Sequence, residues 1–136
     1  MAQDYHDLLV WQKAIDLTVG IYRLTQGFPT SELYGLTSQM RRASVSVASN
    51  IAEGRGRLNA AEFRQFLGVA QGSLFELRTQ IMVARKMELA SDDACSKADY
   101  LCQEVSKMLR TFIERLTPQP RSARSERQLQ RGAVTN

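Results

Sequence analysis

The chain has 136 residues, of which 43% are hydrophobic and 24% charged, the proportions expected of one soluble globular domain. No stretch approaches the ~18 apolar residues that a membrane-spanning helix requires, which argues against helical membrane spans. Residues 1–12 contain acids where a secretory signal needs bases, and they lack a long apolar core. We therefore expect a cytoplasmic protein.

The net charge of +4 is concentrated at the C-terminus. Residues 117–136 hold four of the 18 basic residues and one of the 14 acidic residues, a charge of +3. The remaining 116 residues carry 14 basic and 13 acidic side chains, a charge of only +1. Charge alone is therefore no argument that residues 1–116 bind nucleic acid.

The first predicted helix runs from about Leu8 to Gln26. Asp7 stands where an N-cap residue is needed, and Gly27 and Pro29 stop the helix. Its apolar face consists of Trp11, Ala14, Ile15, Thr18 and Tyr22, widened by Leu17, Ile21 and Leu24. Such a wide apolar stripe predicts a helix that touches two neighbours.

The second predicted helix has Thr30 or Ser31 as its N-cap and becomes regular near Leu36, because Gly35 weakens its first turn. The segment Ala43–Val47 alternates between apolar and polar residues, as a strand would. Helical spacing nevertheless continues over four turns, which is longer than a typical strand, at Leu36, Met40, Val47 and Ile51. We therefore predict a helix throughout.

The glycine turn Gly54–Gly56 is predicted to join the second helix to an antiparallel third helix. Asn59 and Glu62 form a start that resembles a capping box, and the helix then runs to about Leu89. Its predicted core positions are Phe63, Phe66, Leu67, Ala70, Leu74, Leu77, Ile81 and Ala84. Small residues near its middle would let another backbone approach closely, namely Gly68, Ala70, Gly72 and Ser73.

The fourth predicted helix begins after Ser91 as its N-cap, and Pro118 stops it. Its apolar face consists of Ala94, Ala98, Leu101, Val105, Met108, Phe112 and Leu116. Four amphipathic helices with short connections predict an all-α fold, an antiparallel up-down-up-down four-helix bundle within residues 1–116. Residues 117–136 lack a periodic apolar face, which is typical of a disordered basic tail.

No pattern in the chain indicates a catalytic, metal or cofactor site. Cys95 and Cys102 stand seven residues apart on one helix, ~10 Å between Cα atoms, which is too far for a disulfide. With His6 as the single histidine they match no zinc pattern, and we expect them to be buried. The turn Gly54–Gly56 lacks the strand and the Lys-Ser/Thr pair of a phosphate-binding loop. We predict a protein that is not an enzyme and that needs no cofactor.

A polar stripe at helical spacing follows the second predicted helix, at Gln39, Arg42, Ser46, Asn50 and Glu53. One interpretation is a solvated face whose residues pair within the helix. The other is a hydrogen-bond network that faces another subunit, which suits the small polar groups in the stripe. The residues alone favour neither interpretation.

Several motifs resemble those of a known family. They are Leu8, Trp11 and Ala14, Phe28-Pro29, Glu32, Tyr34-Gly35-Leu36, Gln39-Met40-Arg41-Arg42-Ala43, Asn50-Ile51-Ala52-Glu53-Gly54, and Gly72-Ser73 with Glu76-Leu77. Over about residues 8–90 the chain resembles the bacterial four-helix-bundle family of 23S rRNA intervening-sequence proteins, and it is similar to the accessory variability protein of diversity-generating retroelements. The resemblance implies a homopentameric ring of antiparallel bundles. The retroelement protein binds nucleic acid and a reverse transcriptase through basic surfaces.

Two functions follow as hypotheses. The first is an oligomeric accessory factor that binds RNA or DNA, with phosphate contacts from Arg41, Arg42, Arg55, Arg57 and Arg64. The second is a scaffold for protein–protein interaction with no direct nucleic-acid contact. In the second hypothesis the same arginines pair with acids across subunits or on a partner protein.

Overall fold

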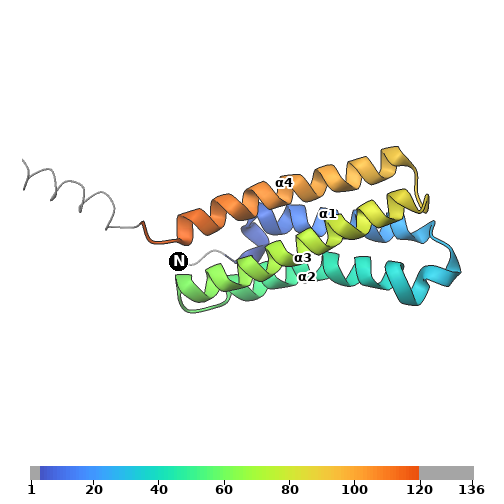
Figure 1. The fold of residues 1–136 in the computed structure, drawn as a ribbon. Helices are drawn as coiled ribbons and strands as arrows, with labels where there is room; N and C mark the ends of the chain where they lie inside the picture. Colours follow the sequence, from blue (N-terminus) through green and yellow to red (C-terminus); the bar gives the residue numbers. More distant parts are fainter. Residues whose placement is uncertain (1–3, 120–136) are drawn as a thin grey trace, which may run out of the picture.

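A computed structural model describes residues 4–119 (Figure 1). Its four long helices are α1 (Leu9–Gln26), α2 (Ser38–Arg55), α3 (Ala60–Lys86) and α4 (Asp92–Leu116). No strand occurs among the described residues, so the all-α prediction is confirmed, including the helix over Ala43–Val47. Most of the predicted tail, residues 120–136, lies outside the described part of the chain.

The helices pack in sequence order, with α1 on α2, α2 on α3, α3 on α4, and α4 back on α1 (Figure 1). Apolar side chains from all four helices meet in one core between them. Its largest fully buried members include Leu17, Ile21, Met40, Ile51, Leu67, Leu74, Leu77 and Leu109. No helix between residues 4 and 119 is both long enough and apolar enough to cross a membrane.

The core face of α1 differs from the predicted one. The buried positions are Val10, Ala14, Leu17 and Ile21, with Thr25 at the end of the helix. Ile15 and Tyr22 are exposed, so their assignment to the core is wrong. The stripe that packs against α2 and α4 is centred on Leu17, and Ile15 and Tyr22 fall on its flank.

The connection between α1 and α2 contains two irregular turns. A 3-10 turn over Thr30–Glu32 is followed by a π-helical turn over Leu33–Thr37, within which Gly35 has non-helical angles (φ −110°, ψ −113°). The regular helix begins at Ser38, slightly later than predicted. Gly35 interrupts the first turn of the helix, as the sequence indicates.

The glycine turn is placed differently from the prediction. Gly54 and Arg55 are the last residues of α2, and the chain turns after them. Gly54 is buried against α3, where a Cβ atom would lie 2.8 Å from Phe66 Cβ and 2.9 Å from Phe63 Cδ1. Gly54 is therefore needed for the close approach of two helices rather than for a turn.

Side chains cap α3 and α4 as predicted. Asn59 Oδ1 accepts a hydrogen bond of 2.9 Å from the backbone N–H of Glu62, and Ser91 Oγ accepts one of 3.1 Å from that of Ala94. These bonds satisfy helix N–H groups that have no partner within the helix. Helix α3 ends at Lys86 rather than near Leu89. Glu88 has a backbone conformation in the left-handed region (φ 58°), so the helix does not continue to Leu89.

The predicted core positions of α3 are buried with one exception. Phe66 is only half-buried, because it lies over the end of α2 beside Gly54 rather than between the helices. On α4, Cys95 and Cys102 are buried free thiols, as predicted.

Candidate nucleic-acid interface

Two of the five candidate arginines are engaged inside the chain. Arg41 Nε donates a hydrogen bond of 2.9 Å to Thr25 Oγ1, and its guanidinium carbon lies 4.7 Å from the centre of the Tyr22 ring. Arg64 donates a bond of 2.9 Å to the carbonyl of Leu116 at the end of α4. A helix end leaves its carbonyls unpaired and favours a positive charge, so Arg64 acts there as a cap.

Two further arginines lie where α2 ends and α3 begins, and both approach aromatic rings of α3. The Arg57 guanidinium carbon is 4.6 Å from the centre of the Phe66 ring, and that of Arg55 is 5.9 Å from the centre of the Phe63 ring. Arg57 is exposed and Arg55 is half-buried. The cation–π contact restrains Arg57 while leaving its charge at the surface.

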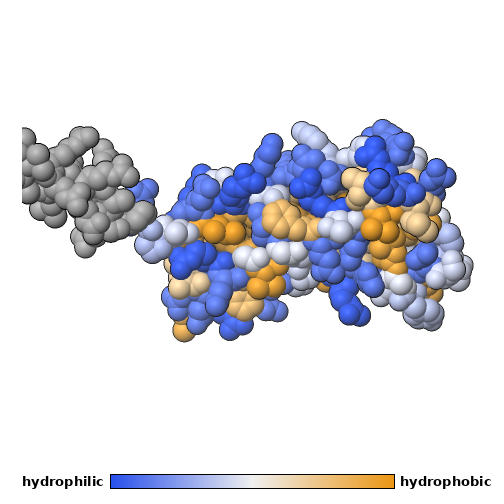
Figure 2. Space-filling view, in the orientation of Figure 1, coloured by the Kyte–Doolittle hydropathy of each residue, from blue (hydrophilic) through white to orange (hydrophobic). Residues whose placement is uncertain are grey.

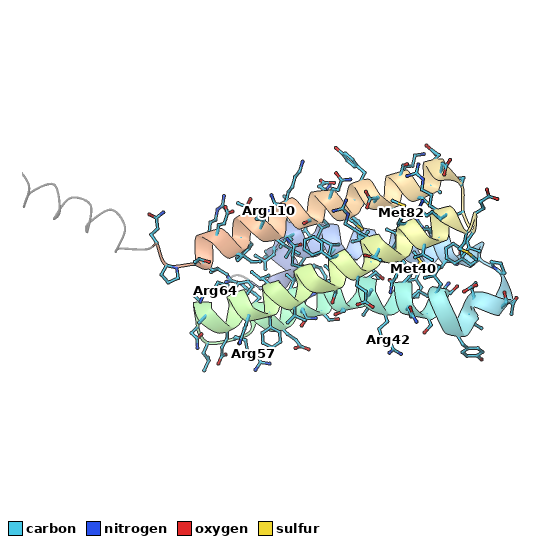
Figure 3. The ribbon with its side chains drawn as sticks, in the orientation of Figure 1. Met40, Arg42, Arg57, Arg64, Met82 and Arg110 are labelled. Atoms are coloured by element: carbon cyan, nitrogen blue, oxygen red, sulfur yellow. The ribbon has the colours of Figure 1, made fainter. Side chains whose placement is uncertain are left out.

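Arg42 is exposed on α2 and makes no hydrogen bond or ion pair with residues 4–119. Figure 3 shows Arg42 and Arg57 projecting away from the bundle on the same side, beside α2. The fold therefore brings Arg42 and Arg57 to one side of the molecule, with Arg55 near the end of α2. Arg64 lies toward α4 instead.

The polar stripe of α2 divides into two parts. Ser46 Oγ lies 2.8 Å from Ser73 Oγ on α3, and Asn50 Nδ2 donates to both the carbonyl (2.8 Å) and the hydroxyl (3.0 Å) of Ser46. This network joins α2 to α3 within one chain. The other three members of the stripe are exposed, namely Gln39, Arg42 and Glu53.

The outward face of α3 is poor in charge. At Gly68 and Gly72 an added Cβ would meet no atom within 4 Å, so the helix backbone is bare there. Val69 and Phe75, close to these glycines, and Val83, further along α3, are about half-exposed. In Figure 2 a broken band of hydrophobic residues crosses the side of the molecule on which α3 lies, with hydrophilic residues above and below it.

A hollow of about 540 Å³ opens between α1, α2 and the turn that joins them. Its polar lining consists of Tyr22, Tyr34, Thr37, Ser38, Arg41 and Arg42, and Leu33 and Val45 supply apolar surface. We call it the tyrosine hollow. Val45 also lines a second hollow of about 240 Å³, which continues along α1 and α2 toward Trp11.

The tyrosine hollow does not follow from the sequence pattern. Tyr22 has helical spacing with Ala14 and Thr18, so the pattern assigns it to the core. Tyr34 and Thr37 reach the hollow through the π-helical turn, whose geometry the sequence does not specify. The sequence signal for this site is Gly35, a glycine in the first turn of a predicted helix. It directly follows Tyr34, which is exposed in the structure.

Other reactive groups in the described residues do not form a site. Burial raises the pKa of the Cys102 thiol to about 12, so it is protonated at neutral pH and is a poor nucleophile. Asp99 on α4 forms an ion pair with Arg78 on α3. The hydrogen bond from Arg78, and a second one from Gln103, hold the pKa of the Asp99 carboxyl below its usual range. No group of three or more His, Cys, Asp or Glu residues suited to a metal ion occurs between residues 4 and 119.

Comparison with known proteins gives a family and a structural relative. A family model described as 23S rRNA-intervening sequence protein matches residues 6–111. A crystal structure from Bacteroides thetaiotaomicron, described as a protein of unknown function from the S23 ribosomal protein family, has 19% identity to the chain and a TM-score of 0.70. The match covers 77% of this chain and 98% of that one, and it shows a shared fold. No curated protein matches the chain.

Proposed function

Because the chain belongs to the 23S rRNA-intervening sequence protein family, we propose that it is a non-enzymatic, cytoplasmic accessory factor that binds RNA or DNA. In this proposal up-down-up-down bundles assemble with copies of themselves into a ring, most simply a homopentamer. The family's name refers to an rRNA, and the resemblance to the accessory variability protein of retroelements implies both nucleic-acid binding and the ring. The exposure of Arg42 and Arg57 on one side of the bundle carries the proposal (Figure 3).

Assembly is supported by the outward face of α3. Gly68 and Gly72 leave the backbone uncovered, and the apolar side chains Val69, Phe75 and Val83 of the same helix are about half-exposed. Small residues allow a second helix to approach closely, and the apolar side chains supply area to bury. A second copy of the chain that packs here would cover both.

We expect the unaltered protein to have several times the 15.3 kDa mass of one chain in light scattering, and the variant Gly72→Leu to have the mass of one chain. The new side chain meets open space within the monomer, so it should block assembly without disturbing the fold. Ser96→Leu, at an exposed position on α4, is the matched control and should leave the mass unchanged. A monomeric parent would refute assembly, and an unaltered mass for Gly72→Leu would place the interface elsewhere.

Nucleic-acid binding is expected to depend on repetition of weak contacts. Residues 1–116 carry a charge of only +1, so one copy should bind weakly. A ring repeats the same arginines around its axis, and several weak contacts with one polymer then add as avidity. The acids Glu53 and Glu76 are also exposed and would repel phosphates, which weakens the binding of one copy further. Because the contacts are between arginines and phosphates, binding should fall as the salt concentration rises.

We expect the double variant Arg55→Gln/Arg57→Gln to bind RNA or DNA more weakly and with a flatter dependence on salt. Removing one arginine–phosphate pair should reduce the slope of log K against log salt by about one. Titration of a labelled oligonucleotide at several salt concentrations measures both the affinity and this slope.

The matched control is Arg110→Gln/Arg115→Gln, which removes two exposed arginines of α4 and therefore the same charge. Both double variants retain residues 117–136, so any contribution of the basic tail is common to them. Equal losses of affinity would show that only net charge matters. If the parent does not bind at low salt, the nucleic-acid function is refuted.

The second candidate, a protein–protein scaffold, is favoured by the same face of α3, which is poor in charge. In that case the exposed Arg42 and Glu53 would pair with charges on a neighbouring subunit or a partner. The parent would then assemble but would not bind nucleic acid at any salt concentration.

A further inference from the structure

We propose that the tyrosine hollow binds one unpaired nucleotide of a single-stranded nucleic acid, with its base against the Tyr34 ring and its phosphate at Arg41 and Arg42. This inference rests on the proposed nucleic-acid function and names the part of the polymer that is recognised. It concerns a site formed by α1, α2 and the turn between them, away from Arg55 and Arg57.

The charge of the hollow suits a phosphate. Arg41 and Arg42 both line it, and none of its lining residues is acidic. Arg41 is held in place, because its Nε donates to Thr25 Oγ1 at 2.9 Å and its guanidinium stacks on Tyr22. A positively charged group that is fixed before binding loses less entropy when an anion arrives.

A buried hydroxyl in the hollow has no partner. Thr18, Thr25, Thr79 and Thr117 each donate to the carbonyl four residues earlier, at 2.7 to 2.9 Å. Thr37, the last residue of the π-helical turn, is only 3% exposed, yet its Oγ1 has no hydrogen-bond partner among the described residues. A buried polar group without a partner is costly, and this hydroxyl is closed to solvent, so the cost is carried by the turn itself.

The aromatic ring that would hold the base is already exposed. Tyr34 is 94% exposed in the π-helical turn, whereas one face of the Tyr22 ring is covered by Arg41. Bases stack on such rings whatever their identity, and arginines beside the rings hold the phosphates. The volume of about 540 Å³ lies within the range of small-molecule sites and is sufficient for one nucleotide.

This arrangement should discriminate between single strands and duplexes. A paired base in a duplex is stacked between its neighbours and cannot place its face on a protein ring. The arginines alone would bind both forms, because both carry phosphates. Preference for single strands therefore reports on the Tyr34 ring and not on charge.

The test uses fluorescence anisotropy with the full-length protein and an unstructured RNA of about 12 nucleotides, offered as a single strand and as a duplex. We expect the parent to prefer the single strand. Tyr34→Ala should weaken single-strand binding by about 5- to 150-fold, the range for loss of one stacked base, and should leave duplex binding unchanged. Tyr34→Phe, which keeps the ring, should bind as the parent does, and so should Tyr100→Ala, which removes an exposed tyrosine from α4.

A second variant separates binding from folding. Thr37→Val keeps the shape of the side chain and removes the unpartnered hydroxyl, so the protein should be at least as stable as the parent. Because the hydroxyl is closed to solvent, the variant should bind the single strand as the parent does. Unchanged single-strand affinity in Tyr34→Ala would overturn the inference, and so would equal losses for single strand and duplex in that variant.

The result for the parent distinguishes this inference from the proposed function. If the parent binds duplex and single strand equally well, the hollow does not select unpaired bases, while nucleic-acid binding by the protein stands. If the parent binds neither form, both proposals fail.

Discussion

Replacing Leu74 with alanine is expected to lower the free energy of unfolding by about 2–5 kcal/mol. Leu74 is fully buried near the middle of α3, within the apolar cluster to which all four helices contribute. Truncation removes apolar surface and leaves a cavity that rigid helices on each side cannot fill. Chemical denaturation followed by circular dichroism measures the change.

Phe66→Ala is the companion variant, because the same sequence pattern assigns both residues to the core. Phe66 is half-buried at the edge of the α2–α3 contact, so its truncation leaves a surface notch that water can fill. We expect a smaller loss of stability than for Leu74→Ala, although phenylalanine is the larger side chain. Equal losses in the two variants would contradict the structure at this end of the bundle.

Replacing Gly54 with alanine is expected to destabilise the protein by about 1–3 kcal/mol, although alanine favours a helix more than glycine does by about 1 kcal/mol. The added Cβ would lie 2.8 Å from Phe66 Cβ and 3.2 Å from the carbonyl oxygen of Phe63. Both atoms are tied to the α3 backbone, so relief requires the two helices to separate. Thermal unfolding measures the result.

Gly20→Ala is the matched control within α1. A Cβ there would meet only Leu101 Cδ1, at an ordinary contact distance of 4.0 Å. Helix propensity should therefore dominate, and the variant should be more stable by up to about 1 kcal/mol. Opposite signs for the two variants are expected, whereas stabilisation by Gly54→Ala would show that the helices do not touch there.

The face of α3 that is proposed for assembly and the tyrosine hollow lie on different sides of the bundle. The outward face of α3, proposed for assembly, carries Gly68 and Gly72, whereas the tyrosine hollow lies between α1 and α2. A second copy on the first face would leave the hollow open. Each subunit of an assembly could then present its own hollow to one strand, which would raise the overall affinity.

The sequence by itself determined the helices, because helical periodicity and capping are local properties. Asn59 and Ser91 cap α3 and α4 through bonds to residues three positions later, so the signal and its partner lie in one turn. The spacing of Leu67, Leu74, Leu77 and Ile81 likewise identified buried positions on α3. The family resemblance was also identified from sequence motifs, and the family model that matches residues 6–111 agrees with it.

Only the tertiary structure decided which part of each apolar stripe is covered, because that depends on where neighbouring helices lie. Ile15 and Tyr22 share helical spacing with Trp11 and Thr18, but the neighbouring helices leave Ile15 and Tyr22 at the surface. The sequence does not distinguish Gly54 from a glycine that a turn requires, because glycine is needed here for the close approach of α2 to α3. The partners of Arg41 and Arg64 are 16 and 52 residues away along the chain. Contacts across such separations arise from packing, and no local pattern encodes them.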